Sequence, residues 1–255
     1  TVQEKMTSTG WGQIPVLQKD TNKIIGIVTR TDLLRAIGNS KTRKSVRRNL
    51  ISHLKKNLSP AVLSFLQLLA EHASLQKLPI YIVGGFVRDL LLERPVLDFD
   101  IVVEGDAIAL ATSLQKKFGG KLNSHKRFGT AKWQINHLTF PTSVDLGFSP
   151  VDLPDSLDLI SARTEFYEFP SALPQVEPSS IKFDLHRRDF SINTLALRLD
   201  GRHFGDLYDF WGGLEDLNSG VIRVLHSLSF IDDPTRLLRA VRFEQRFSFH
   251  IEKRT

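Results

Sequence analysis

The feature that most constrains this 255-residue chain is a short apolar strand that ends in two glycines. Ile80-Tyr81-Ile82-Val83 is typical of a buried strand, and Gly84-Gly85 then leads into a helical pattern over 87–92. Glycines at such a turn let a phosphate approach the backbone, and the helix N-terminus adds free N–H groups. Arg88, one turn into the helix, can add a bidentate phosphate contact. The spacing matches neither a dinucleotide GxGxxG fingerprint nor a P-loop.

Two aspartates follow this turn in the stretch Leu97-Asp98-Phe99-Asp100-Ile101-Val102-Val103. Side chains two residues apart in a strand share a face, so Asp98 and Asp100 are expected side by side, with Phe99 turned into the core. Adjacent carboxylates repel each other unless a cation lies between them, and Mg²⁺ prefers such oxygen ligands together with substrate phosphates. The pattern therefore predicts a two-metal site for displacement at phosphorus. A pair of aspartates at an exposed strand end is the simpler alternative.

A third carboxylate would help to hold a second ion, and the sequence offers three candidates. Asp158 lies in the strand-like alternation Leu157-Asp158-Leu159-Ile160-Ser161, which can run beside the strand of Asp100. Asp145 and Glu165 compete for the same role. The sequence alone favours none of the three strongly.

The stretch His186-Arg187-Arg188-Asp189-Phe190-Ser191-Ile192-Asn193 places two arginines before an aspartate. Asp189 is expected to cap a following helix. Arg188 can reach a triphosphate, and Asn193 a sugar hydroxyl. A surface ion pair is the simpler interpretation of an Arg-Arg-Asp triplet taken alone.

A last motif opens a helix with Asp233 as the cap and Pro234 as the first helical residue. Arg236, Arg239 and Arg242 recur every three residues, so neighbouring arginines share a face. Asp233 and Arg236 can point together, and a carboxylate beside a guanidinium matches the amino group and ring nitrogen that cytosine and adenine both present. Uracil and guanine present the reverse order. The alternative is a basic helix stabilised by its own aspartate cap.

Together these motifs resemble the bacterial-type (class II) tRNA nucleotidyltransferase and poly(A) polymerase family, within the polymerase-β-like superfamily. The resemblance covers residues 58–249, and further agreement comes from Ile160-Ser161-Ala162-Arg163-Thr164-Glu165, Ala172-Leu173-Pro174, Ser179-Ser180-Ile181-Lys182 and Phe210-Trp211-Gly212-Gly213-Leu214-Glu215-Asp216-Leu217. It implies an α+β fold, with a nucleotidyltransferase head on a small mixed sheet over 58–205 and the start of a helical neck over 206–255. We expect the body and tail that grip tRNA in this family to be absent.

The resemblance also implies roles for individual residues. The aspartates that bind two Mg²⁺ ions are matched by Asp98 and Asp100, with Asp158 as a possible third carboxylate. Residues implied in nucleotide binding are Gly84, Gly85, Arg88, Arg188, Asp233, Arg236, Arg239 and Arg242. Phe128-Gly129-Thr130-Ala131 matches a flexible element between strands. Asp232 stands where the family usually has glutamate, which can alter helix capping while leaving the base-reading pair intact.

Residues 1–39 form a separate α/β pattern, in which Thr31 or Asp32 can begin a helix. Two strand signals precede that helix around a polar turn: Ile14-Pro15-Val16-Leu17 and Ile24-Ile25-Gly26-Ile27-Val28. The pattern resembles the closing half of a CBS repeat, a module that senses adenosyl nucleotides, and implies ribose contacts for Thr31 and Asp32. The helix expected between Met6-Thr7 and Gly10 is missing from the pattern. A docking remnant without ligand is therefore the alternative.

Composition excludes several classes of protein. With no cysteine there is no disulfide, no thiol nucleophile and no cysteine-based zinc site. The apolar runs are far shorter than the roughly 20 residues that span a bilayer, so we expect no membrane partner and a cytoplasmic protein. The 34 basic and 28 acidic residues leave a formal charge of +6. The basic stretch 40–57 is expected to be a linker that faces solvent or touches nucleic-acid phosphates.

These features predict a Mg²⁺-dependent, template-independent nucleotidyltransferase that adds AMP, CMP or both from ATP and CTP to the 3′ end of tRNA and releases pyrophosphate. The CBS-like segment tilts the prediction towards addition of A alone, because it resembles the arrangement in long A-adding enzymes. A poly(A) polymerase for general RNA shares the same head motifs. A nucleotide-sensing CBS module with a degenerate head is the non-enzymatic alternative, and the intact pair of aspartates argues against it.

Overall fold

A computed structural model describes residues 2–9, 11–19, 21, 23–29, 32–33, 48–96, 98–135, 153–166 and 175–255. Several residues named above lie outside these ranges, namely Gly10, Thr31, Leu97, Asp145 and Ala172-Leu173-Pro174. The chain divides into two compact units, which we describe separately. The smaller comprises Thr1–Ser45 with His226–Leu228, and the larger comprises Val46–Leu225 with Ser229–Thr255.

The smaller unit contains a helix and a hairpin. Strands β1 (Gln13–Leu17) and β2 (Ile24–Thr29) pair antiparallel, as the strand signals predict. Helix α1 (Val2–Thr9), which the sequence did not predict, includes Met6-Thr7 and ends before Gly10. Its weak apolar periodicity hid it, although Met6 is buried. The cap after β2 also differs from the prediction, because the Thr29 hydroxyl accepts from the Asp32 backbone N–H while the Asp32 carboxylate accepts from the Thr29 N–H.

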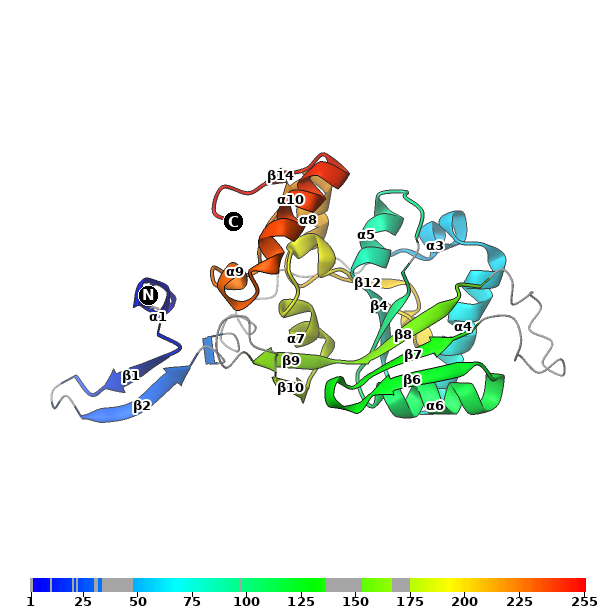
Figure 1. The fold of residues 1–255 in the computed structure, drawn as a ribbon, viewed down its shortest axis with the longest axis horizontal. Coiled ribbons are helices and arrows are strands. Elements are labelled where there is room, and N and C mark those ends of the chain that lie inside the picture. The colour runs from blue at the N-terminus through cyan, green and yellow to red at the C-terminus, as the bar shows by residue number, and fades with distance from the viewer. Residues whose placement is uncertain are drawn as a thin grey trace. The chain divides into compact units, whose positions relative to one another are not determined.

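One mixed sheet of eight strands organises the described part of the larger unit (Figure 1). The parallel pair is formed by the fifth and sixth strands, which carry the candidate carboxylates, and the other neighbours are antiparallel. In spatial order the strands are β3 (Arg48–Asn49), β12 (Asp206–Tyr208), β11 (Ala196–Arg198), β4 (Ile80–Val83), β5 (Asp100–Val103), β8 (Ser156–Ser161), β7 (Thr130–Gln134) and β6 (Lys121–His125). The predicted α+β class with a mixed sheet is confirmed.

The main hydrophobic core lies on one face of this sheet. Helices α4 (Pro60–Leu75) and α6 (Ala107–Phe118) cover this face, and the Phe65 and Trp133 rings, both fully buried, lie 6.0 Å apart. Both helices begin at side-chain caps, since the Ser59 hydroxyl accepts from Val62 N–H and the Asp106 carboxylate accepts from two backbone amides of α6. These caps fix where the helices start against the sheet.

A smaller apolar cluster lies on the opposite face, over β4, β5 and β11. Tyr81 and Val102 meet Ile181 and Leu185 of the short helix α7 (Ile181–His186) there. A separate antiparallel pair, β9 (Arg163–Phe166) and β10 (Gln175–Pro178), lies next to α7. On β7 and β8 the same face carries polar side chains, and Lys132 and Asp158 there are about half exposed.

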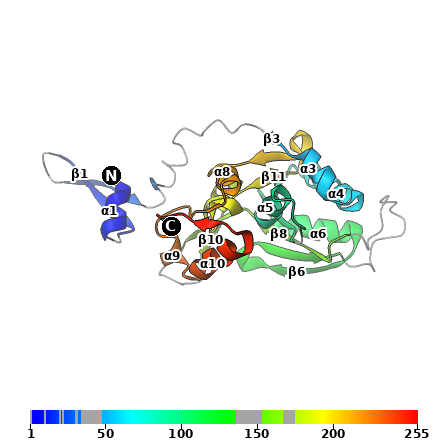
Figure 2. The same cartoon turned by 90° about the horizontal axis from the view of Figure 1, so that it is seen from above.

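The predicted linker over 40–57 does not match the packing of its second half. β3 pairs with β12, and helix α3 (Ile51–Asn57) follows it at once. Leu50 and Leu54 are fully buried in the main core, so this part belongs to the larger unit, where α3 contacts α4 (Figure 2). Two short strand residues and a two-turn helix carry too little periodicity to be told from a linker.

The expected boundary between head and neck at 205 also shifts, because β12 belongs to the main sheet. After β12 come helix α8 (Gly213–Asn218), the parallel pair of β13 (Val221–Ile222) and β14 (His250–Ile251), and helices α9 (Ser229–Asp232) and α10 (Thr235–Phe247). Helix α10 buries Arg236, Ala240, Phe243 and Phe247 against the rest of the unit. No helix in the ranges described is long and apolar enough to cross a membrane.

Candidate active site

The glycine turn after β4 is held in a conformation that only glycine adopts easily. Gly84 has φ +66°, and helix α5 (Gly85–Leu91) begins directly after it. A Cβ at Gly84 would lie 2.6 Å from Nη1 of Arg188, so the guanidinium lies against the backbone of the turn. The Arg188 Nε is buried and has no hydrogen-bond partner in the described part of the chain. Such a donor beside a glycine turn is suited to an anionic ligand.

The two aspartates lie at the beginning of β5. Asp100 is its first residue, and the exposed Asp98 precedes the strand rather than forming part of it. Phe99 is buried in the main core, as the alternation predicts. Asp158 of β8 is the direct register partner of Asp100, because β5 and β8 run parallel. The fold therefore brings together two carboxylates that are far apart in the sequence.

Burial and four nearby charged residues act on the pKa of Asp100. Burial raises the pKa of Asp100 above its usual value, Arg188 opposes this shift, Asp158 and Asp98 reinforce it, and Lys132 opposes it. A cation beside a carboxyl group that is buried near other carboxylates favours its ionised form. Oxygen donors of this kind fit Mg²⁺, so the residues present are compatible with the ion that the family implies.

The carboxylates are nevertheless not arranged as a finished metal centre. Within the described ranges, no three His, Asp or Glu side chains converge closely enough to hold an ion. Instead, Lys132 Nζ of β7 lies 3.4 Å from Asp158 Oδ2. A protein cation thus neutralises the carboxylate that is best placed to complete the pair.

The competing candidates for the third carboxylate differ in availability. Glu165 is nearly buried and accepts from Arg163 at 3.0 Å and Arg187 at 2.9 Å, so its charge is already balanced. Asp158 is the candidate that the sheet places beside Asp100.

Arg88 differs most from the role expected for it. Its side chain is only 6% exposed, and it donates to both carboxylate oxygens of Asp89 and to Asn193 Oδ1 at 2.7 Å. Its guanidinium also lies 5.2 Å and 4.7 Å from the ring centroids of Phe243 and Phe247 in α10. In this conformation Arg88 connects α5 to α10 and presents no free donor fork to a phosphate.

Asp189, which follows the two arginines of its motif, also connects to α10. Its carboxylate accepts from Phe190 N–H and from the Asn193 side chain, and Arg239 of α10 donates to it at 2.7 Å. A 3₁₀ turn, η3 (Ser191–Asn193), follows Asp189 in place of the expected helix. Asn193 and Arg239 are thus occupied by protein partners, whereas the exposed Arg242 forms no hydrogen bond or ion pair with the described residues.

The proposed base-reading pair does lie together. Arg236 Nε is 3.8 Å from Asp233 Oδ2. Arg236 is buried and donates to Ser229 Oγ and to the backbone carbonyl of Arg187. The other Asp233 oxygen accepts from Thr235 N–H, which makes Asp233 the side-chain cap although α10 begins one residue later than predicted.

Sequence reasoning missed two residues of this site, Lys132 and Asp184. Lys132 could have been found from the alternation Thr130-Ala131-Lys132-Trp133-Gln134, which puts polar residues on one strand face. Asp184 is fully buried and pairs with Arg187 at 2.8 Å and with Arg188 at 3.5 Å. No local pattern reveals its burial.

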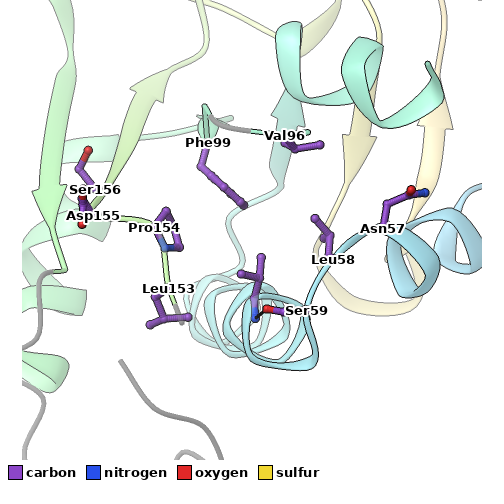
Figure 3. Close-up of a pocket in the computed structure, with 10 residues that line it drawn as sticks. Asn57, Leu58, Ser59, Val96, Phe99, Leu153, Pro154, Asp155 and Ser156 are labelled. Carbon is purple, nitrogen blue, oxygen red and sulfur yellow. Dashed lines mark hydrogen bonds between the residues drawn. The ribbon is translucent and has the colours of Figure 1, made fainter. Parts of the chain in front are cut away.

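A cavity of about 530 Å³ lies near the aspartates but not beside them. Asn57, Leu58 and Ser59 line one side, and Leu153, Pro154, Asp155 and Ser156 line the other, with Phe99 pointing between them (Figure 3). Because Phe99 and Asp100 point to opposite faces of the sheet, this cavity is behind the carboxylates. It is therefore not the site of the proposed chemistry.

Residues 80–223, more than half of the chain, match the family model described as the Poly A polymerase head domain. The chain therefore belongs to this family. Residues 1–39 match the CBS domain. Both matches confirm the family resemblance drawn from the motifs.

Several known proteins are similar to the chain. The A-adding tRNA nucleotidyltransferase of Geobacter sulfurreducens is 41% identical over 95% of this chain and 27% of that protein, and the A-adding enzyme of Halalkalibacterium halodurans is 42% identical over 81% and 45%. A CCA-adding enzyme in its apo form II is 47% identical, with a TM-score of 0.70 over 81% of this chain and 45% of that one. The Thermotoga maritima CCA-adding enzyme, in a complex with tRNA, is 43% identical, with a TM-score of 0.66 over 81% of this chain and 43% of that one. The chain thus spans less than half the length of these relatives.

Proposed function

We propose that this chain carries the nucleotide-adding site of a template-independent tRNA nucleotidyltransferase. The observation that carries the proposal is the register pairing of Asp100 with Asp158, together with the Arg188 guanidinium that lies against the glycine turn after the neighbouring strand β4. Carboxylates bind metal ions that balance phosphate charge, and an arginine beside a glycine turn binds phosphate directly. This combination fits transfer of a nucleotide from a triphosphate.

In the proposed reaction, the 3′ hydroxyl oxygen of tRNA attacks the α-phosphorus of ATP, pyrophosphate leaves, and the hydroxyl proton is lost to solvent. Asp98, Asp100 and Asp158 would hold the Mg²⁺ ions, which supply charge neutralisation and activation of the hydroxyl when bound. Arg188 and the backbone of the turn orient the triphosphate. No covalent enzyme intermediate is needed.

Base choice is assigned to Asp233 and Arg236. The Asp233 side chain remains about one-third exposed, whereas Arg236 is held in place by Ser229 and the Arg187 carbonyl. A fixed guanidinium beside a carboxylate offers one donor and one acceptor edge, which suits adenine and cytosine. Addition of A alone is favoured over addition of CCA, because relatives that match 95% and 99% of this chain, its CBS segment included, are A-adding enzymes.

Incorporation assays with ATP and CTP, on tRNA transcripts that end in C-C or lack C-C, test this proposal. We expect AMP to be added once to the transcripts ending in C-C, with little use of CTP. Robust use of CTP on transcripts lacking C-C would rule out addition of A alone. A long tail of A on general RNA would instead identify a poly(A) polymerase.

Two further parts of the proposal concern the rest of the chain. Residues 1–39 would bind an adenosine nucleotide, which equilibrium dialysis with labelled ATP and AMP can test on variants at Asp32. In this structure the Asp32 carboxylate accepts from Thr29, so we expect Asp32→Ala to alter the turn as well as any ribose contact. A cytoplasmic location is consistent with a site that uses carboxylates, arginines and no cysteine.

A further inference from the structure

Two segments of the chain, 33–70 and 107–144, contain basic residues and no acidic ones, and the second includes strands of the sheet that carries the site. Residues 107–144 contain no Asp or Glu and six Lys or Arg, namely Lys116, Lys117, Lys121, Lys126, Arg127 and Lys132. Outside this segment, 34 − 6 = 28 basic residues balance the 28 acidic ones. All six basic side chains are exposed. Only Lys132 forms an ion pair within the described residues, so five charges remain available for an anionic partner.

The register of the sheet places part of this positive charge on the same face as the carboxylates. Asn123 of β6 pairs with Lys132 of β7, Lys132 pairs with Asp158 of β8, and Asp158 pairs with Asp100 of β5. Directly opposed residues share a face, and so do residues two apart on one strand. Lys121 and His125 of the edge strand therefore face the same side as the aspartates.

The tip of this hairpin continues the basic surface. The 3₁₀ turn η1 (Lys126–Phe128) joins β6 to β7, and the Arg127 guanidinium lies 5.5 Å from the ring centroid of Phe128. By contrast, Lys116 and Lys117 lie in the last turn of α6, which covers the opposite face of the sheet. The segment thus has two separate basic groups, and one of them shares a face with the site.

We propose that Lys121, His125, Lys126 and Arg127, here called the basic hairpin, bind the phosphates of the single-stranded 3′ end of the RNA that receives the nucleotide. This inference rests on the proposed function. Neighbouring strands lie about 4.8 Å apart, so β6 is roughly 14 Å from β5. At about 3.4 Å per stacked nucleotide, this distance corresponds to about four nucleotides. An RNA end placed across the strands would thus have its phosphates at the edge and its 3′ hydroxyl at the aspartates.

Lysines on an edge strand also protect proteins from edge-to-edge aggregation, and this is the competing explanation. It predicts that loss of the charges promotes self-association without changing RNA binding. Protection of the edge strand also does not explain the basic residues Lys126 and Arg127, which lie in η1 beyond that strand.

The test uses fluorescence anisotropy with a labelled single-stranded RNA that ends in C-C, measured over a range of salt concentrations. The variant is Lys121→Gln/Lys126→Gln/Arg127→Gln, and the matched control is Lys116→Gln/Lys117→Gln. Each lost phosphate contact lowers the slope of log K against log salt by about 0.7, so the triple variant should lose about 2. We expect its affinity to be lower at low salt, and its loss of affinity between 50 and 200 mM salt to be about twentyfold smaller than that of the wild type. The control should stay within about a factor of two of wild type, which is a smaller loss per charge removed.

Circular dichroism melts establish that both variants are folded, and light scattering detects self-association. The inference is overturned if the wild-type chain does not bind the RNA, if the triple variant binds like wild type, or if both variants lose affinity equally per charge. AMP incorporation separates this inference from the proposed function. If the wild type adds AMP and the triple variant has an unchanged KM for RNA, the inference alone fails. If RNA binding follows the prediction but no AMP is added, the proposed function alone fails and the hairpin stands as an RNA-binding surface.

Discussion

Replacing Arg88 with methionine separates a structural role for this residue from a role in phosphate binding. Methionine keeps an apolar side chain but removes the guanidinium that lies over the Phe243 and Phe247 rings. The Asp89 carboxylate would then be left 11% exposed without its bidentate partner, and Asn193 would lose its hydrogen bond from Arg88. The experiment therefore measures how much the buried pair of Arg88 and Asp89 contributes to the free energy of unfolding.

The structure sets the expected magnitude. Removing one partner of a buried ion pair typically costs about 3–5 kcal/mol. Arg246 lies 3.6 Å from Asp89 and is 42% exposed, so it can partly replace the lost charge. We therefore expect a loss near the lower end, about 3 kcal/mol. For a unit of this size, that loss lowers Tm by roughly 6–12 °C.

Urea unfolding followed by circular dichroism measures the loss, with ATP binding by calorimetry as the second readout. Arg242→Met is the matched control, because Arg242 is exposed on α10 and should change stability by less than about 0.5 kcal/mol. The reasoning is refuted if Arg88→Met unfolds at the wild-type urea concentration while ATP binding is lost. That outcome would make Arg88 a phosphate ligand, as the sequence alone suggested.

Three further predictions follow from the same site. Asp100→Asn should raise Tm at pH 7.5, and this gain should vanish towards pH 4. The pKa of Asp100 is raised in the folded state, so the folded state loses stability as Asp100 ionises with rising pH. A Tm difference that does not depend on pH would contradict this. Gly84→Ala should lower the free energy of unfolding by about 1–3 kcal/mol and weaken ATP binding, because its Cβ displaces Arg188. Gly85→Ala is the control, since its Cβ would meet only an ordinary contact at 3.5 Å. It should lose less stability in urea unfolding and less ATP affinity in calorimetry. Arg236→Ala should change the ratio of nucleotides incorporated from an equal mixture of four more than it changes ATP affinity, and the ratio does not depend on the folded fraction.

Elements with strong patterns could be predicted from the sequence with their boundaries. The predicted strand over 80–83, the strand over 100–103 and the helix over 107–118 agree with β4, β5 and α6. Each combines a clear apolar pattern with glycines or an aspartate at its end, so local chemistry and tertiary packing agree. The short elements α1 and β3 lack such patterns and were not predicted.

The partners of charged residues could not be predicted in the same way. Arg88 bonds Asn193, and Arg239 bonds Asp189, across separations that only the fold determines. The sequence shows that arginines are present but not which of them are neutralised inside the protein. The proposed carboxylates were easier to find, because the two-residue spacing of Asp98 and Asp100 within an apolar strand pattern is itself unusual.

The most direct test of the central claim is Mg²⁺-dependent incorporation of labelled AMP into a tRNA transcript ending in C-C. It is measured for the wild-type chain and for Asp98→Ala. We predict incorporation by the wild type that requires Mg²⁺, and a loss of at least about a hundredfold in the variant, which melts at the wild-type temperature because Asp98 is exposed. Undiminished incorporation by Asp98→Ala would contradict the assignment of the carboxylates and with it the account of this site.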